Sequence, residues 1–168
     1  MKKRIAAAGI FSAVIAAVIL ASVLNERKRI RDAFSEYEAS CTGFADFLLK
    51  DAQPAGQENV IYAVSDHDGK YRLVRMGGGT NSEVLLSAAD EADLRQTKQA
   101  FYKMTGRSGI AYISVSKDYI VFQEDSYGGK LIYSVQGGID RAHRKTDQDY
   151  QVFRKINENW YAVYINAI

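Results

Sequence analysis

The hydrophobic pattern begins with an uncharged run near the N-terminus. Residues 5–24 (IAAAGIFSAVIAAVILASVL) contain no charged side chain, and clusters of Lys and Arg lie on both sides of them. At about 1.5 Å of rise per residue, twenty helical residues span about 30 Å, which matches the hydrocarbon core of a bilayer. The pattern therefore predicts a single-pass membrane anchor over residues 1–25.

A cleaved signal peptide is the main alternative to an anchor. Signal peptidase requires small residues at positions −3 and −1, and residues 20–25 (LASVLN) do not supply such a pair. The run is also longer than the roughly 7–15 apolar residues typical of a signal peptide. A buried soluble helix is a third alternative, but the other 144 residues are too few to cover every face of it.

The orientation of the anchor depends on the flanking cations. Three precede the run and four follow it within seven residues, so the positive-inside rule discriminates only weakly. A short basic tail ahead of an apolar run is typical of a secretory start signal. We therefore expect a cell-membrane protein whose C-terminal domain is extracytoplasmic.

A second helix is predicted over residues 26–50. Its apolar side chains recur at spacings of three and four and form one stripe. The members of this stripe are Ala33, Phe34, Tyr37, Cys41, Phe44, Phe47 and Leu48. Because no Pro or Gly-rich break separates the run from the stripe, anchor and stalk are predicted to form one long helix, followed by a globular domain over residues 51–168.

The first part of that domain is predicted to form a hairpin and a helix. Residues 59–64 and 71–76 are strand-like, and the pair Asp68-Gly69 between them is a strong hairpin signal. Ser87 begins a capping-box-like S-A-A-D sequence, and Gly106 follows at a position suited to ending the helix.

The remainder is predicted to be antiparallel sheet. Five further strands are expected at residues 110–116, 119–124, 131–135, 150–156 and 160–165. The order α-β-β-α-β-β-β-β-β indicates an α+β fold, a β-meander with helices on one face. In element order alone, it is similar to two architectures: the profilin-like and PAS-like sheets, and the cone-shaped sheet of the nuclear-transport-factor-2 (NTF2-like) type.

Charge and composition limit the possible partners. The net charge of +2 comes from the membrane flanks, and residues 33–168 carry a net charge of −3. A slightly acidic domain is a poor nucleic-acid binder, because phosphate contacts need clustered positive charge. The single cysteine excludes an intrachain disulfide, and one core suits a chain of this length.

Few side chains are candidates for chemistry. Cys41 lies in the apolar stripe without neighbouring cations, so it is expected to be a packed thiol rather than a reactive or acylated one. His67, between Asp66 and Asp68, is expected to be a solvated turn residue, because the sequence around it lacks the spacing of a metal loop. His143 is expected to lie in a solvated basic loop, and the alternative is that this loop binds an anionic partner.

Two further motifs resemble functional loops only superficially. Residues 77–80 (GGGT) come between a strand and a helix but lack the Lys-Ser/Thr of a phosphate loop and the parallel β-α-β unit of a dinucleotide site. Ser114, Ser116 and Lys117 are expected to be ordinary strand and turn residues rather than a nucleophile with its base.

Aromatic side chains crowd the C-terminal sheet. Most are expected to pack in the core, and a minority could line a pocket or an interface. They are Tyr112, Tyr119, Tyr127, Tyr133, Tyr150, Tyr161 and Tyr164, together with Phe122, Phe153 and Trp160.

These observations predict a membrane-anchored, non-catalytic α+β domain that binds a partner protein or a small ligand. We assign no catalytic, cofactor-binding or metal-ligating residue and expect no cofactor and no nucleic acid. One alternative is a minor pilin-like assembly subunit, although residues 9–14 (GIFSAV) lack the acidic residue of a pilin start. The other is a small enzyme with a cone-shaped sheet pocket.

Overall fold

The computed structural model describes residues 2–53, 59–77, 81–124, 128–139 and 151–165, without the side chains of residues 2–14, 151 and 165. Its three helices are α1 (Lys2–Ser35), α2 (Glu38–Ala52) and α3 (Ala88–Thr105). The eight strands are β1 (Asn59–His67), β2 (Lys70–Met76), β3 (Ser82–Val84), β4 (Tyr112–Ser116), β5 (Tyr119–Gln123), β6 (Lys130–Ser134), β7 (Gln151–Lys155) and β8 (Trp160–Ile165).

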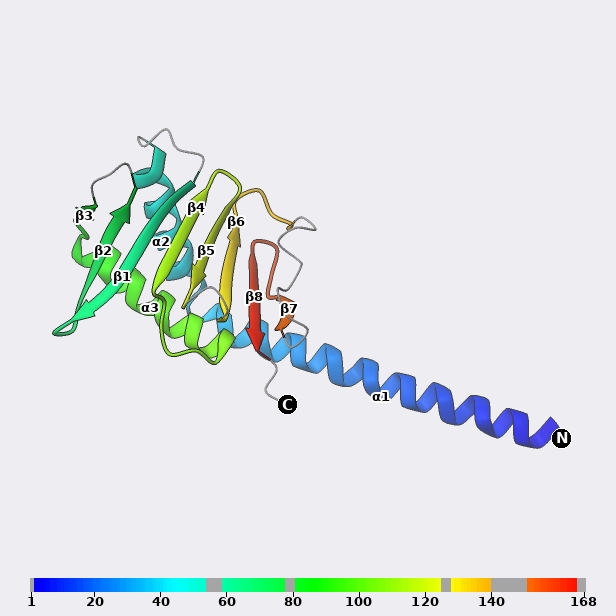
Figure 1. Ribbon diagram of the computed structural model, residues 1–168. Helices are drawn as coiled ribbons and strands as arrows, with labels where there is room; N and C mark the ends of the chain where they lie inside the picture. Colours follow the sequence, from blue (N-terminus) through cyan, green and yellow to red (C-terminus); the bar gives the residue numbers. More distant parts are fainter. Residues whose placement is uncertain (1, 54–58, 78–80, 125–127, 140–150, 166–168) are drawn as a thin grey trace.

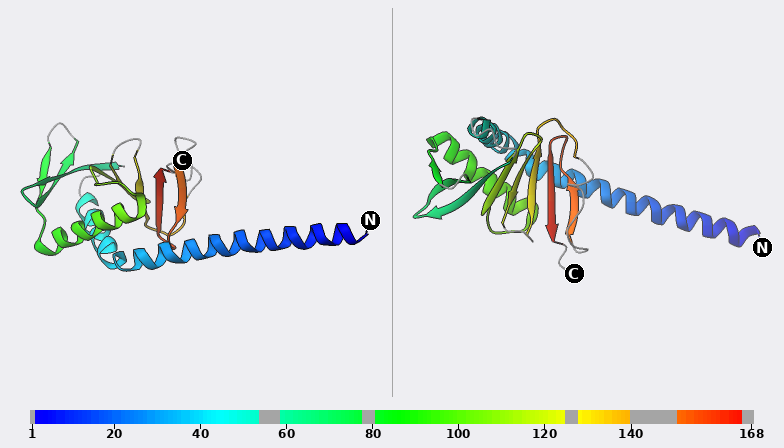
Figure 2. Two further views of the ribbon diagram at one scale, coloured as in Figure 1. Left: turned by 90° about the horizontal axis from the view of Figure 1, so that it is seen from below. Right: turned by 45° about the horizontal axis from the view of Figure 1, so that its top comes forward.

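All eight strands form one antiparallel sheet with the order β3-β2-β1-β4-β5-β6-β8-β7. Helices α2 and α3 and the end of α1 lie on one face of this sheet (Figures 1 and 2). The predicted α+β class and the antiparallel sheet are confirmed. Two details differ from the predicted meander: β3 is an additional strand, and β8 rather than β7 pairs with β6.

The expected single helix over residues 26–50 is interrupted between α1 and α2. The backbone N–H of Tyr37 donates to the carbonyl of Phe34 at 2.8 Å, and that of Cys41 donates to the carbonyl of Tyr37 at 2.9 Å. The apolar stripe nevertheless stays on one side, because Phe34, Tyr37 and Cys41 are all buried. The interruption lets α2 pack along α3 while α1 leaves the domain in another direction (Figure 1).

Local signals placed the β1–β2 hairpin and α3 correctly. Asp68 and Gly69 both have positive φ angles, 54° and 74°, as a two-residue hairpin turn requires. Ser87 and Asp90 form the complete capping box at the start of α3. Gly106 ends α3 with a φ of 71°, a conformation that glycine adopts without steric cost.

The main core lies between the helices and the sheet. Its centre is an aromatic cluster around Trp160, whose ring centroid lies 5.3 Å from Phe34, 6.0 Å from Phe122 and 4.9 Å from Tyr133. The indole is only 1% exposed, and its Nε1 has no hydrogen-bond partner in the described part of the chain. Helix α1, the sheet and the C-terminal hairpin therefore share one packed centre.

A smaller cluster is buried on the other face of the sheet. It consists of Ile132, Ile139, Tyr161 and Val163, with Phe153 packed against them. The final strand thus buries side chains on both faces, since Trp160 and Ala162 belong to the main core. The second face of β8 is therefore partly covered as well.

Among the residues that the structure describes, no helix is both long and apolar enough to cross a membrane. The side chains of residues 2–14, which include half of the predicted span, lie outside the described residues. The anchor therefore stays a prediction from the sequence.

Replacing the central indole tests this description of the core. We expect Trp160→Ala to lower the free energy of unfolding by about 3–5 kcal/mol, because it leaves a cavity among Phe34, Phe122 and Tyr133. Trp160→Phe should cost clearly less, because the lost N–H has no partner among the described residues. Chemical denaturation measures both variants, with Tyr102→Ala on the exposed side of α3 as the control. A Trp160→Ala midpoint equal to that of the control would contradict the core assignment.

Candidate functional site

Part of α1 stands clear of the domain (Figure 1). Residues 15–24 contain no charged side chain, and every one of them is exposed. Val18 and Leu20, for example, are 64% and 60% exposed. A contiguous apolar surface of this kind is typical of a segment that is covered by a membrane or by another protein.

The last turns of α1, in contrast, are docked on the domain. Phe34 is buried against Trp160, and Ile30 packs at the edge of the same core. Glu26 forms an ion pair with Arg154 of β7, with 2.9 Å between Oε1 and Nη1. The segment from Glu26 onward therefore contacts the sheet, through one ion pair at Glu26 and through buried packing from Ile30 to Phe34.

A separate groove of about 540 Å³ runs along the solvent side of α3. Its floor is formed by side chains that recur at helical spacing, and its walls come from the β1–β2 hairpin, from the α1–α2 junction and from the segment after α3. The lining residues are Tyr37, Asp66, Tyr71, Arg95, Lys98, Gln99, Tyr102, Lys103 and Ser108. The groove is open to solvent along its length rather than enclosed.

Two cations at the hairpin end of the groove share one tyrosine ring. The Nζ atom of Lys98 lies 4.2 Å from the centroid of Tyr71, and the Cζ atom of Arg95 lies 5.4 Å from it. Burial lowers the pKa of Lys98, and the nearby Asp66 carboxylate, 3.8 Å away, acts against that shift. Arg95 has Glu91 at 3.6 Å.

The third cation lies at the other end of the groove. The Nζ atom of Lys103 is 4.9 Å from the ring centroid of Tyr37 and 3.6 Å from the Glu36 carboxylate. The hydrogen bond with the Tyr37 hydroxyl is the main cause of the raised pKa of Lys103. The groove lining therefore carries three cations and one carboxylate, and the cations pair with acids at 3.6–3.8 Å, which is longer than a tight charge-assisted hydrogen bond. Such cations can exchange a loose partner for a bound anion.

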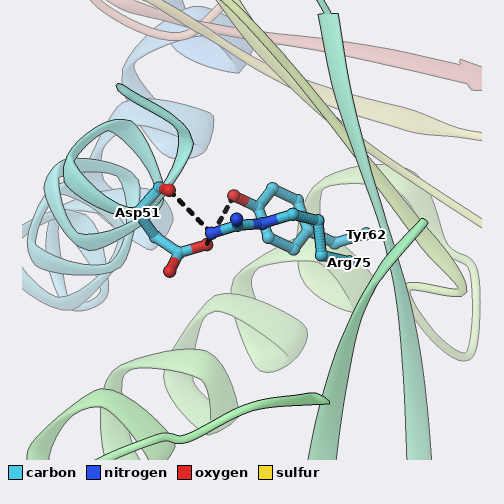
Figure 3. Close-up of polar contacts among 3 residues, drawn as sticks. All are labelled: Asp51, Tyr62 and Arg75. Carbon is cyan, nitrogen blue, oxygen red and sulfur yellow. Dashed lines mark hydrogen bonds and ion pairs between the residues drawn. The ribbon is translucent and has the colours of Figure 1, made fainter. Parts of the chain in front are cut away.

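Asp51, Tyr62 and Arg75 form a second polar cluster (Figure 3). The Tyr62 hydroxyl donates to Asp51 Oδ2 at 2.7 Å, and Arg75 Nη2 donates to the same oxygen at 2.5 Å and to the Asp51 carbonyl at 2.7 Å. Burial, and then the bond to Asp51, raises the pKa of Tyr62, so the phenol keeps its proton. We interpret the cluster as a clamp that joins the end of α2 to the β1–β2 hairpin.

Cys41 is fully buried in α2. Burial raises the pKa of its thiol to about 12, a shift that the hydrogen bond to Thr97 reduces and the charge of Asp93 increases. Because the thiolate is the reactive form of cysteine, these surroundings favour the packing role expected from the sequence.

The two histidines are not brought together with other ligands. His67 is the last residue of β1 rather than a turn residue, is exposed, and lies 2.9 Å from the Asp68 carboxylate. His143 lies outside the described residues. Among the side chains that the structure describes, no group of three or more His, Cys, Asp and Glu residues is placed to hold a metal ion.

The loop motifs have ordinary structural surroundings where they are described. Ser116 donates to the carbonyl of Tyr119 and accepts from its N–H, both at 3.0 Å, and so stabilises the β4–β5 turn. Ser114 lies in β4 and Lys117 in that turn. Of the GGGT motif only Gly77 is described, with a φ of 134°.

The C-terminal aromatics divide between the two clusters and the surface. Tyr133 packs on the main core, Tyr119 on the smaller cluster, and Tyr112 is 41% exposed. Tyr164 hydrogen-bonds Arg154, while Tyr127 and Tyr150 lie outside the described residues. The groove is lined by other tyrosines, of which the sequence analysis had named only Tyr37, as a member of the apolar stripe. The sequence signal that could have indicated the groove is the recurrence of Arg95, Lys98, Tyr102 and Lys103 at helical spacing.

A scan of protein-family models, a search of curated proteins and a search of solved structures each gave no match to this chain. The similarity to the profilin-like, PAS-like and NTF2-like sheets therefore rests on element order alone.

The environment of Cys41 predicts its reactivity. We expect the folded protein to react with an aromatic disulfide reagent at pH 8 much more slowly than the unfolded chain, because the thiol is buried and protonated. The folded pKa is raised above the ordinary value of 9.0, so this group lowers stability as the pH rises from about 9 toward 12. In Cys41→Ala this contribution to the loss of folding stability at alkaline pH should be absent. Rapid labelling of the folded protein would contradict the packing role.

Proposed function

We propose that this protein is a single-pass membrane protein whose C-terminal domain binds an acidic segment of a partner protein outside the cytoplasm. The exposed, uncharged surface of residues 15–24 supports the anchor, because nothing in the described part of the domain covers it. The uncharged run in the sequence extends this surface toward the N-terminus as far as residue 5.

The groove along α3 is the observation that supports a binding role. Arg95, Lys98 and Lys103 supply positive charge, while Tyr37 and Tyr71 supply aromatic surface beside it. Carboxylates bind favourably to such cations, and apolar or aromatic side chains to the tyrosine rings. Small-molecule sites usually enclose most of their ligand, so an open groove favours a segment of chain over a small ligand.

A binding role is also favoured by the state of the reactive side chains. Cys41 is protonated within the core, Ser116 is engaged in its turn, and Tyr62 is held by Asp51. Each of these groups is packed in the core or hydrogen-bonded to another part of the domain. We therefore propose that the domain acts by recognition rather than by catalysis.

A pilin-like assembly subunit is the second candidate function. It is favoured by the continuity of α1, which runs from Lys2 to Ser35 and ends on an antiparallel sheet. In this case the exposed segment of α1 would pack against copies of itself. Cross-linking through single cysteines at Val18 or Leu20 separates the two functions, because an anchor predicts monomers in membranes and an assembly subunit predicts ladders.

The anchor is tested by membrane extraction of the full chain. We expect the protein to stay with membranes after high-salt and carbonate washing, and its mass to include Met1 or to begin at Lys2. Ile15→Arg, which places a charge near the middle of the uncharged run, should weaken this retention. Release of a soluble form that begins near residue 25 would contradict the anchor.

The groove is tested with a fluorescent peptide of alternating Glu and Tyr residues and the full chain in detergent. We expect Lys98→Met to weaken binding about tenfold, because it removes a charge that is paired only loosely with Asp66 while keeping the aliphatic stem on Tyr71. Lys117→Met, at an exposed turn, is the matched control and should bind like the wild type. Fluorescence anisotropy measures both. Equal affinities would contradict the groove as the site, and full competition by benzoate would indicate a small anionic ligand instead.

A further inference from the structure

The contact between Glu26 and Arg154 limits how far the domain can lie from the membrane. Glu26 is only two residues beyond Leu24, where the uncharged run ends, and two helical residues rise about 3 Å. Glu26 belongs to α1 and already contacts the sheet. If residues 5–24 span the bilayer, the docked part of α1 begins at the edge of the hydrocarbon core.

The contact also determines which part of the domain faces the bilayer. Arg154 belongs to β7, the strand at one end of the sheet order, and α1 passes this end of the sheet on its way out of the domain (Figures 1 and 2). The opposite end of the sheet, with β2 and β3, lies farthest from the exposed part of α1. The β7 end is therefore the membrane-proximal end.

This end of the molecule carries cations that form no ion pair with a carboxylate in the described part of the chain. Arg27, Lys28 and Arg31 are exposed on α1, and no ion pair joins them to any residue that the structure describes. Lys155, next to Arg154 on β7, is exposed as well. The three α1 cations lie about 4–10 Å beyond Leu24 along the helix axis, and the polar layer on each side of a bilayer is roughly 5–7 Å thick. Because helical side chains tilt toward the N-terminus, their charged groups point back into that layer.

We propose that the β7 end of the domain rests on the bilayer surface, with Arg27, Lys28, Arg31 and Lys155 in contact with anionic lipid headgroups. This inference rests on the proposed membrane anchor and adds a lipid class and a fixed domain orientation to it. The docked helix holds the domain in place, and the phosphates of anionic lipids supply acidic partners to four cations that pair with no carboxylate among the described residues. The Nζ atom of Lys155 has the Tyr161 ring at 5.9 Å, a contact that leaves its charge open to a phosphate. The groove along α3 then lies at a fixed height above the membrane.

The orientation is tested by depth measurement on the full chain in vesicles. Spin labels are attached at Lys155→Cys and, as the matched control, at Lys70→Cys in the β1–β2 hairpin, both in a Cys41→Ala background. Collision with oxygen and with a water-soluble nickel complex should place the Lys155 label at the headgroup layer and the Lys70 label in water. Inserting four residues after Asn25 should lift the domain by about 6 Å and move the Lys155 label into water.

The lipid class is tested by comparing labelled phosphatidylglycerol with labelled phosphatidylcholine at the protein surface. With about 30% phosphatidylglycerol in the vesicles, we expect at least a twofold preference for the anionic lipid. The variant Arg27→Gln/Lys28→Gln/Arg31→Gln should lose the preference, whereas Lys50→Gln/Lys70→Gln/Arg72→Gln, which removes equal charge at the far end, should keep it. Inorganic phosphate should reduce the preference no more than chloride does at equal ionic strength.

Three results would overturn the inference. A Lys155 label as accessible to water as the Lys70 label, in a chain that stays with the membrane, would refute the orientation and leave the anchor intact. Loss of the preference in phosphate but not in chloride would indicate a site for free phosphate instead of lipid. Release of the whole chain by carbonate would refute the anchor, and the inference with it.

Discussion

Phe34 lies in the last described turn of α1, with its ring 5.3 Å from the indole of Trp160 on β8, and both side chains are almost fully buried. This contact joins the long N-terminal helix to the strand near the C-terminus. Trp160 also contacts Phe122 of β5 and Tyr133 of β6, so one cluster connects three strands and a helix. Because aromatic side chains bury large areas, a cluster of this kind fixes the direction in which α1 leaves the domain.

Helix α3 packs on the same core with one side and lines the groove with the other. Leu94, Thr97 and Phe101 face inward and are buried, whereas Arg95, Lys98 and Lys103 line the groove. At Gly43 of α2 the Asp93 side chain of α3 lies so close that an added Cβ would be 2.7 Å from its Oδ2 atom. Helices α2 and α3 therefore approach closely on the inner side of α3. The groove is built on a rigid support rather than on a loop, which favours recognition with little rearrangement.

The predictions that succeeded came from signals within short stretches of chain. The Asp68-Gly69 turn and the Ser87–Asp90 capping box are local, since each depends on backbone conformation and hydrogen bonds within a few residues. The break between α1 and α2 was missed because the apolar stripe continues through Tyr37, and only the packing of α2 along α3 requires a change of direction there. The clamp of Asp51, Tyr62 and Arg75 was missed because it joins residues from three different elements.

The sequence by itself determined the α+β class, most of the strands and an uncharged run suited to a bilayer. It also determined that the segments of α2 and α3 are helices with one apolar side. These features follow from periodicity and from local turn chemistry. Only the tertiary structure decided that β8 lies between β6 and β7, where Ser134 and Asn159 exchange hydrogen bonds at 2.8 Å. Either strand of the final hairpin has the alternation needed to pair with β6, so the choice depends on long-range packing around Trp160. The groove likewise exists only in the folded chain, because Tyr37, Tyr71 and Lys98 are far apart in sequence and meet through the docking of helices on the sheet.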